Sequence, residues 1–438
     1  MKLVVSPARS LRGEVTLPGD KSISHRALMF AAVADGTSSV RNWLDAGVTA
    51  RMVDCIQALG VDVAIESTGL GRATLTVRGQ GLSGLAAPAE PLCCGGSATT
   101  MRLLMGLLAT QPFTAALDGH AGLRRRPMER IARPLRQMGA TIDTIAGHAP
   151  ITVTGGRLVG IDYRMPVASA QLQTALLLAA LGATGKMTLR QPGPARDHTL
   201  RLLQGQGARL DCDDQGTITF DPDNFSLKPL NFSVPGDMSA AAFLMTAALI
   251  VEGSQMIIKA VNTNDTRAGL LETYQAMGGR IATNAKRMEG GEPVGDLVIE
   301  SGRLQGVEVS GDVVVRMIDE FPVFTVAALQ AQGKTLVRDA AELRLKESDR
   351  IEAVVEEFSK MGARIVPHPA GYEIDGPQRL KGATVSSHRD HRLAMSLAIA
   401  GLVATGRTVI EDAQELNESF PGFVEILRDL GADIERYE

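Results

Sequence analysis

Basic and hydroxyl side chains stand where an apolar helix is predicted to begin. Lys21, Ser22 and Arg26 follow the turn LPGD at 17–20, and Ser22 and Arg26 are four residues apart, so they share one helix face. Free N–H groups and the helix dipole at such a helix end favour anions. The segment therefore predicts an anion site, although a capped, solvated helix start explains it equally well when it is taken alone.

Three further segments place polar groups beside predicted helix starts. GGSATTMR at 95–102 is a small-residue turn that exposes N–H groups and keeps Arg102 nearby, and ASAQ at 168–171 stands at the mouth of an apolar helix. LRRRPM at 123–128 and RDH at 196–198 are, in isolation, more typical of solvated surface and of an ordinary turn. The recurrence of such groups at one structural position is what favours a functional interpretation.

Carboxylates and cations alternate in the last third of the chain. MIDEFPVF places Asp319 and Glu320 at a helix start, and ELRLKESDRI places Lys346 and Arg350 four residues apart, which predicts a like-charged pair on one helix face. A bound anion would relieve that repulsion, and so would the acidic residues between the two cations. Similarly, SHRDHRLAMS is expected to place His388 and Arg392 on one helix face, and the adjacent arginines argue against a zinc site there.

These groups are carried by a unit that recurs six times. An apolar helical segment, a glycine and a β-like run appear as IQALGVDVAI, LRQMGATID, LLQGQGARL, YQAMGGRIA, FSKMGARIV and LRDLGADIE. A glycine just past a helix favours a left-handed C-terminal cap, so each marker predicts a helix end followed by a strand. The marker glycines are Gly60, Gly139, Gly207, Gly278, Gly362 and Gly431.

A second, nearly all-apolar helix recurs in phase with the first, as in ALLLAALGATGKMTLRQP. Each unit is therefore expected to carry one buried and one amphipathic helix alternating with strands, in layered α/β domains. LPGDKSIS at 17–24 is echoed three units later by VPGDMSAA at 234–241, which predicts two halves of three units. We expect a first domain at 18–233 and a second formed by 1–17 plus 234–438, with a hinge at the two Pro-Gly-Asp turns.

Composition narrows the class of protein further. The 438 residues carry a formal net charge of -4, which gives no general attraction to nucleic acid or to anionic lipid. Four scattered cysteines do not form a disulfide framework or a zinc pattern, and the longest apolar run, LLLAAL, is too short to span a membrane. The N-terminus does not resemble a signal or transit peptide. We therefore expect a cytoplasmic enzyme that binds neither nucleic acid nor membrane.

The motifs together resemble the 5-enolpyruvylshikimate-3-phosphate (EPSP) synthase family. The similarity runs from LPGDKSISHRA through RPM, ASAQ, RDHT, VPGD, MIDEFP, LRLKESDRI and DHRLAMS to SFPGF, and so covers the whole chain. It implies the two-domain enolpyruvyl transferase fold, an inside-out α/β barrel of six βαβαββ-type units, three per domain. It also implies transfer of the enolpyruvyl group of phosphoenolpyruvate to the 5-hydroxyl of shikimate 3-phosphate, by a monomer without a metal or other cofactor.

The resemblance assigns roles to individual residues. Asp319 would be the base for the 5-hydroxyl, Glu347 the proton donor to the methylene carbon, and Lys21 an aid to proton transfer and to phosphate departure. Domain closure would assemble groups that neither half holds alone. Shikimate 3-phosphate would be held by Lys21, Ser22, Arg26, Ser169, Ala170, Gln171, Arg196, Asp319 and Lys346, and phosphoenolpyruvate by Lys21, Ala98, Arg126, Gln171, Arg350 and Arg392.

The turn at 95–102 departs from the family pattern Asn-[Ala/Ser]-Gly-Thr. Gly96 replaces the asparagine, and Ala98 replaces the glycine that lines the phosphoenolpyruvate pocket. Ala98 and Leu103, like Glu418, resemble the glyphosate-tolerant branch of the family. One added methyl group would exclude the longer inhibitor, so we expect weak glyphosate binding.

Three alternatives share parts of this pattern. The enolpyruvyl transferase that acts on UDP-N-acetylglucosamine has the sixfold architecture, but it carries Lys-Asn where Lys21 and Ser22 stand, and it usually has a cysteine in the loop before Arg126, where this chain has none. A ring-shaped DNA clamp would spread its cations along helices and needs no carboxylate base. A non-catalytic binder of phosphorylated ligands would not need Asp319 and Glu347.

Overall fold

The computed structural model describes residues 1–213, 215–222 and 226–437, which form two compact units. The N-terminal unit comprises Gly19–Val234 and Glu289–Glu292. The C-terminal unit comprises Met1–Pro18, Pro235–Met288 and Pro293–Glu438. Each unit has its own hydrophobic core and is described by itself below.

Each unit contains three four-stranded sheets with one common strand order. In every sheet the first two strands are parallel, and the third strand is antiparallel to the second. The N-terminal unit has β16 (Asn231–Ser233), β3 (Asp35–Leu44), β5 (Arg72–Gln80), β4 (Asp62–Gly69); β6 (Leu92–Cys93), β7 (Thr114–Asp118), β9 (His148–Thr154), β8 (Thr141–Ile145); and β11 (Asp162–Arg164), β13 (Met187–Arg190), β15 (Thr217–Phe220), β14 (Leu210–Cys212).

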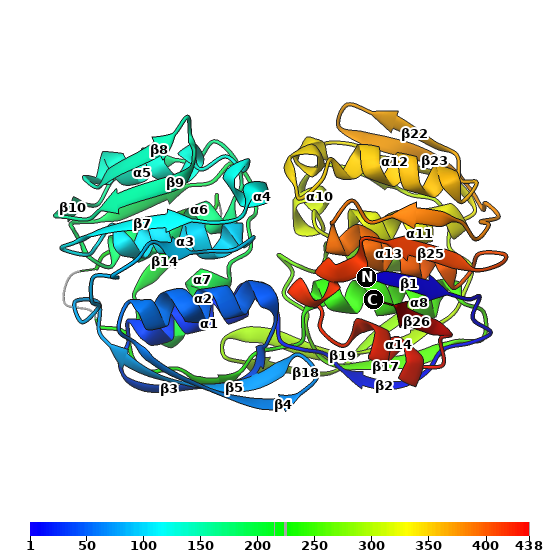
Figure 1. Cartoon of the computed structure of the whole chain (residues 1–438), viewed down its shortest axis with the longest axis horizontal. Helices are drawn as coiled ribbons and strands as arrows, with labels where there is room; N and C mark the ends of the chain where they lie inside the picture. The colour runs from blue at the N-terminus through cyan, green and yellow to red at the C-terminus, as the bar shows by residue number, and fades with distance from the viewer. Residues whose placement is uncertain (214, 223–225, 438) are drawn as a thin grey trace. The chain divides into compact units, whose positions relative to one another are not determined.

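The C-terminal unit repeats this order, and its last sheet joins the two ends of the chain. Its sheets are β2 (Arg12–Thr16), β17 (Gln255–Asn262), β19 (Glu292–Glu300), β18 (Arg280–Glu289); β20 (Glu308–Val309), β21 (Gly333–Val337), β23 (Gly371–Gly376), β22 (Ile365–His368); and β24 (Thr384–Ser386), β25 (Thr408–Glu411), β1 (Lys2–Val5), β26 (Ile434–Tyr437). Figure 1 shows β1 and β26 side by side where the two termini lie. A short pair, β10 (Leu158–Val159) with β12 (Ala183–Thr184), adds to the N-terminal unit.

The helices alternate between a buried and an amphipathic type, as the repeat predicts (Figure 1). The buried helices are α1 (Lys21–Ala32), α3 (Ala98–Leu108), α6 (Ala170–Ala180), α8 (Met238–Ile250), α11 (Phe321–Gln330) and α13 (His391–Gly401). The partly exposed helices are α2 (Gly47–Ala58), α5 (Glu129–Met138), α7 (His198–Gly205), α9 (Gly269–Ala276), α12 (Arg350–Lys360) and α14 (Phe423–Asp429). Short turns of helix are α4 (Ala121–Arg124), α10 (Asp312–Arg316), η1 (Ala341–Leu345) and η2 (Ala413–Glu418).

The marker glycines adopt the backbone conformation that the sequence predicts. All six have φ between 83° and 113°, in the left-handed region where a side chain would be strained. Each follows an amphipathic helix and precedes a strand or an extended segment. The sixfold repeat is therefore confirmed at the level of the backbone.

The two Pro-Gly-Asp turns have the capping chemistry expected of them. The Asp20 carboxylate accepts a hydrogen bond from the Ile23 N–H at 3.0 Å, and the Asp237 carboxylate accepts one from the Ser239 N–H at 2.7 Å. A Cβ at Gly19 would lie 2.1 Å from the carbonyl oxygen of Asn42, so the first turn requires glycine. The chain passes from one unit to the other at these turns.

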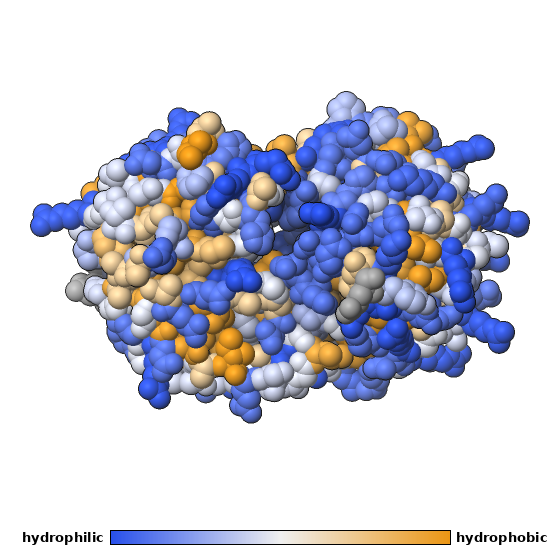
Figure 2. Space-filling view, viewed as in Figure 1, coloured by the Kyte–Doolittle hydropathy of each residue, from blue (hydrophilic) through white to orange (hydrophobic). Residues whose placement is uncertain are grey.

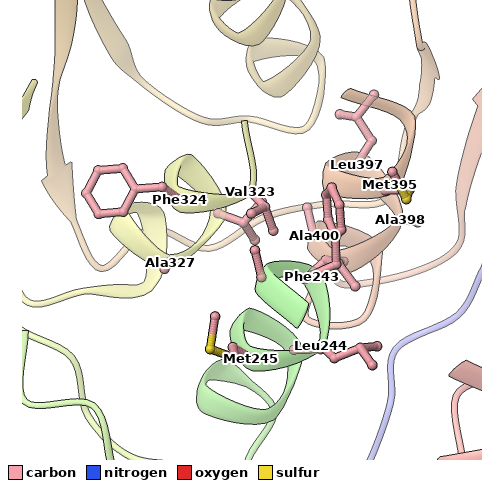
Figure 3. Close-up of a cluster of buried hydrophobic side chains, with 14 of the residues drawn as sticks. Phe243, Leu244, Met245, Val323, Phe324, Ala327, Met395, Leu397, Ala398 and Ala400 are labelled. Atoms are coloured by element: carbon pink, nitrogen blue, oxygen red, sulfur yellow. The ribbon is translucent and has the colours of Figure 1, made fainter. Parts of the chain in front are cut away.

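Apolar side chains from the buried helices fill the core of each unit. In the C-terminal unit, α8, α11 and α13 bring together Phe243, Phe324, Leu397 and their neighbours, as Figure 3 shows. Phe243 also meets the ring of Phe423 on α14 edge to face, with centroids 6.0 Å apart. These packed helices hold their N-terminal ends, and the polar residues on them, in fixed positions.

Hydrophilic residues cover most of the face seen in Figure 2, and the apolar residues there form small scattered patches. Within the described ranges, no helix is long and apolar enough to cross a bilayer.

Candidate active site

Arg26 is buried at the point where three helices of the N-terminal unit meet. Only 2% of its surface is exposed, and it donates to the hydroxyls of Thr199 at 2.9 Å and Thr174 at 2.8 Å and to the carbonyls of Ser22 at 2.9 Å and Ala170 at 3.2 Å. Burial lowers the pKa of its guanidinium to about 10, helped by the nearby charge of Arg196. The residue therefore holds the starts of α1, α6 and α7 together.

The other predicted ligands of the N-terminal unit surround Arg26. Lys21 and Ser22 open α1, Ser169 caps α6 by accepting from the Leu172 N–H at 3.4 Å, and Arg196 donates to the Ser22 hydroxyl at 3.4 Å. The structure thus brings together Lys21, Ser22, Arg26, Ser169, Ala170 and Arg196, which the sequence spreads over 176 positions. Two helix N-termini and several cations converge there, which is the chemistry of an anion site.

Gln171 is fixed by two neighbours that the sequence analysis did not assign to the site. Arg102 donates to the Gln171 amide oxygen at 2.6 Å, and the Gln171 amide nitrogen donates to the Thr99 hydroxyl at 2.9 Å. Arg102 also donates to the carbonyl of Pro127 at 3.0 Å, beside Arg126. Arg102 thereby links the loop of Arg126 to α6, and its position just after the small-residue turn is the signal that could have identified this role.

The loop before α3 is tied to α1 through a buried histidine. The His25 ring lies 2.8 Å from the Lys21 carbonyl through Nδ1 and 3.4 Å from the Ser97 hydroxyl through Nε2. Burial lowers the pKa of His25 to about 4, so the ring is neutral at pH 7. Nε2 also lies 3.2 Å from the Val48 carbonyl, so a neutral ring, with its single N–H, donates to one of the two backbone carbonyls that it faces.

Ser97 in turn caps α3, whose first residue, Ala98, is 5% exposed. Gly96 has no left-handed φ, and a Cβ there would meet nothing within 4 Å. The backbone therefore does not require glycine at this departure from the family pattern.

In the C-terminal unit, Arg350 opens α12 among three carboxylates. It is 2% exposed, and it donates to Asp390 at 2.8 Å and 3.2 Å and to Glu347 at 2.9 Å, while its Nη1 lies 3.7 Å from Asp319. Burial alone would lower the pKa of Arg350, but the charges of Asp390 and Glu347 raise it. Nη1 is buried and makes no hydrogen bond in the described part of the chain, so its one close partner there is the Asp319 carboxylate at 3.7 Å.

Asp319 links two of the predicted cations. Its carboxylate lies 3.2 Å from Lys346 Nζ as well as 3.7 Å from Arg350. The prediction that Lys346 and Arg350 share a helix face was wrong, because the helix begins only at Arg350, where Asp349 caps it, and Lys346 has extended backbone. The common carboxylate, not the helix periodicity, brings these cations together.

Arg392 stands in the first turn of α13 and is 5% exposed. It donates to the Asp319 carbonyl at 3.2 Å and lies 3.7 Å from the buried carboxylate of Glu320. The prediction that His388 shares its helix face was also wrong. His388 lies before α13 with a φ of 51°, and its ring turns to Glu357 on α12 at 2.6 Å.

The predicted residues thus fall into two sets. Those of the N-terminal unit are Lys21, Ser22, Arg26, Ala98, Arg126, Ser169, Ala170, Gln171 and Arg196, and those of the C-terminal unit are Asp319, Lys346, Glu347, Arg350 and Arg392. Both sets lie at the starts of buried or amphipathic helices or in the loops that lead into them. Cations accompany carboxylates in the second set, an arrangement suited to acid–base chemistry on an anionic ligand.

Comparison with solved structures identifies the class of fold. The enolpyruvyl transferase NikO from Streptomyces tendae is similar with a TM-score of 0.81 at 20% identity, over 99% of this chain and 98% of that chain. EPSP synthase from Acinetobacter baumannii is similar with a TM-score of 0.88 at 39% identity, over 99% of this chain and 100% of that one. The enolpyruvyl transferase fold expected from the sequence is thereby confirmed.

Sequence comparison narrows the class to one family. The family model of EPSP synthase (3-phosphoshikimate 1-carboxyvinyltransferase) matches residues 5–427. The 3-phosphoshikimate 1-carboxyvinyltransferases of Desulforudis audaxviator and Desulforamulus reducens are 46% and 45% identical, each over 98% of this chain and 99% of the relative. This chain belongs to the EPSP synthase family of enzymes.

Proposed function

We propose that the protein transfers the enolpyruvyl group of phosphoenolpyruvate to the 5-hydroxyl of shikimate 3-phosphate, which gives EPSP and phosphate. The observation that carries this proposal is the C-terminal set, in which Asp319 and Glu347 flank the buried Arg350, with its Nη1 3.7 Å from Asp319 and its Nη2 2.9 Å from Glu347. A protein that only bound phosphorylated ligands would gain nothing from carboxylates beside those cations, because they weaken anion binding.

The two substrates are divided among the cations by their charges. Shikimate 3-phosphate is held at the starts of α1 and α6 and by Arg196, with Gln171 beneath its ring. Phosphoenolpyruvate is held by Lys21, Arg126, Arg350 and Arg392 around its carboxylate and phosphate. The planar forks of the arginines suit bidentate binding of both groups.

Asp319 and Glu347 carry the proton transfers. Asp319 takes the proton of the 5-hydroxyl while the hydroxyl oxygen bonds to C2 of phosphoenolpyruvate. Glu347 gives a proton to C3, and the product of this addition is a tetrahedral ketal. Glu347, now a carboxylate, then takes a proton back from the new methyl group as phosphate departs with the help of Lys21, which restores the double bond. Arg350 stabilises the Glu347 carboxylate after it has donated, since it bonds that group at 2.9 Å.

The reaction needs both sets of residues, which belong to different units. We infer that shikimate 3-phosphate draws the domains 18–233 and 1–17 plus 234–438 together about the Pro-Gly-Asp hinge, which excludes water from the reaction. X-ray scattering should show a smaller radius of gyration when the ligand binds. The molecular mass from the same measurement should be that of a monomer, 46.4 kDa, with and without the ligand. An unchanged profile would count against closure.

Ala98 supports a further proposal, that the enzyme tolerates glyphosate. Its methyl group stands at the start of α3, where the family pattern has glycine, and fills space that a longer inhibitor would need. Ala98→Gly should increase sensitivity to glyphosate while phosphoenolpyruvate still binds. Strong competitive inhibition of the unaltered enzyme at low glyphosate would contradict this proposal.

The deciding assay for the reaction is phosphate release from phosphoenolpyruvate. We expect release with shikimate 3-phosphate, none with UDP-N-acetylglucosamine, and almost none for Asp319→Ala with either acceptor. Release with the UDP-sugar alone would overturn the proposed function.

A further inference from the structure

The turn between β24 and α13 contains two consecutive residues in an unfavourable backbone conformation. His388 and Arg389 have φ of 51° and 56°, in the left-handed region, which is strained for a residue with a side chain. Such a turn persists only where its surroundings hold it. A neighbouring side chain must therefore hold this turn in place.

Glu357 on α12 bonds both sides of this turn. One of its carboxylate oxygens accepts the Ser386 N–H at 2.8 Å, and the other lies 2.6 Å from His388 Nε2 and 2.7 Å from Lys360 Nζ. The side chain of Glu357 is fully buried. Burial alone would raise the pKa of Glu357, but its bonds to Lys360, Ser386 and His388 lower it, so the group is a carboxylate at pH 7.

The turn leads directly into the predicted phosphoenolpyruvate cations. Asp390, which follows the two strained residues, bonds Arg350 at 2.8 Å and 3.2 Å and caps α13 by accepting the Arg392 N–H at 2.9 Å. Asp390 is fully buried, and its own N–H donates to the Ser387 carbonyl at 2.8 Å. A shift of this turn would therefore move Asp390, and with it both arginines.

We propose that Glu357 is a positioning residue for phosphoenolpyruvate binding, because it fixes the turn 386–390 and, through Asp390, the guanidinium group of Arg350 and the first turn of α13, which carries Arg392. This inference rests on the proposed function of that site. Glu357 itself is not proposed to contact the ligand. It acts through His388, Asp390 and Arg350, which all belong to the C-terminal unit.

The same cluster does not carry a metal site. Ligand atoms of Glu356, Glu357 and His388 lie within 4.8 Å of one another, which is a possible arrangement for a cation. The Lys360 ammonium already lies 3.2 Å from Glu356 and 2.7 Å from Glu357, so it supplies the positive charge there. The cluster is an ion-pair network that holds α12 and the turn 386–390 together.

The test compares two adjacent glutamates in the purified full-length enzyme. Glu357→Gln keeps the shape of the side chain but removes its charge and one acceptor, whereas Glu356→Gln changes an exposed neighbour on the same helix. Glu357→Gln should raise the KM for phosphoenolpyruvate about tenfold, with the KM for shikimate 3-phosphate and kcat changed less than threefold. Glu356→Gln should leave all three within twofold.

His388→Gln provides a second variant in case Glu357→Gln does not fold. It leaves the Glu357 bond to the Ser386 N–H intact, so it should raise the KM for phosphoenolpyruvate about threefold and add little to Glu357→Gln in the double variant. A rise confined to phosphoenolpyruvate in either variant supports the proposal. An unchanged KM for phosphoenolpyruvate, or equal rises for both substrates, overturns it.

Failure of the proposed function would be recognised separately. If the unaltered enzyme does not release phosphate from phosphoenolpyruvate with shikimate 3-phosphate, the assigned reaction is wrong. If it does and the Glu357→Gln enzyme behaves like the Glu356→Gln enzyme, only the positioning role is wrong.

Discussion

Arg26 and Arg350 are two equally buried arginines, one in each unit, with opposite surroundings. Both are 2% exposed. Arg26 donates only to hydroxyls and carbonyls, and burial lowers its pKa to about 10. Arg350 is bonded by Asp390 and Glu347, whose charges raise its pKa despite burial.

This difference separates binding from chemistry. Arg26 donates its hydrogen bonds to neutral acceptors, and the charges of Asp20 and Glu292 offset the effect of burial on its pKa only in part. Around Arg350 the charges are already balanced, and an incoming anion competes with carboxylates that can in turn accept or donate protons. In the proposed function, the N-terminal set holds an anion and the C-terminal set moves protons beside one.

The largest effect should come from removing the proposed base. Asp319→Ala should lower kcat by 10²–10⁴-fold, roughly the contribution of a positioned general base, with a smaller change in the KM for shikimate 3-phosphate. Steady-state phosphate release measures both quantities. If the variant keeps kcat but loses affinity for shikimate 3-phosphate, Asp319 is a binding residue. The assignment of proton transfer to the C-terminal set would then be wrong.

Removing one hydrogen-bond acceptor from Arg26 and one from Arg350 tests whether a neutral and a charged acceptor contribute differently to stability. Asp390→Asn leaves Arg350 buried with less countercharge and should destabilise the fold by about 3 kcal/mol. Thr174→Val removes one neutral acceptor of Arg26 and should cost about 1 kcal/mol. Urea unfolding measures both, and equal losses would mean that the charge of the partner does not matter.

Acid should destabilise the N-terminal unit through His25. Its pKa of about 4 in the folded protein lies below the ordinary value of 6.5, so the unfolded chain binds the proton first. The stabilisation is complete above pH 6.5 and is lost progressively as the pH falls toward 4, by about 2 kcal/mol at pH 5.

The control for this pH effect is His25→Gln, which has no ring to protonate. The difference in unfolding free energy between the unaltered protein and this variant should shrink by that amount between pH 7 and pH 5. A pH-independent difference would show that folding does not lower the pKa of His25.

The smallest effect concerns backbone strain in the C-terminal unit. Arg389→Gly should stabilise the protein by up to about 1 kcal/mol, because glycine adopts a φ of 56° without strain. The gain is reduced by the larger entropy of the unfolded glycine chain. A loss of stability in thermal unfolding would show that the Arg389 side chain contributes more than its backbone costs.

Local patterns account for what could be predicted from the sequence. The marker glycines, the Asp20 and Asp237 caps and the alternation of buried and amphipathic helices depend on a few neighbouring residues, and all are confirmed. The helix assumed for ELRLKESDRI was wrong, because a short 3₁₀ turn and the Asp349 cap interrupt the spacing on which it depended. The site assignments came from whole motifs and stay predictions.

Long-range contacts account for what could not be predicted. Nothing near Arg26 in the sequence indicates that Thr174 and Thr199 bond it, and nothing near Gln171 indicates Arg102. Glu357 looks like one of two equivalent glutamates on an amphipathic helix, yet one is buried against a strained turn and the other is exposed. Pattern alone cannot separate them.

The sequence by itself therefore determined the repeat, the class of fold and the kinds of group available for chemistry, because these depend on periodicity, glycine conformation and capping. Only the tertiary structure decided the electrostatic character of each cation. Whether a buried arginine meets a hydroxyl or a carboxylate depends on segments that lie far from it along the chain, and that choice sets whether the pKa of its guanidinium is lowered or raised.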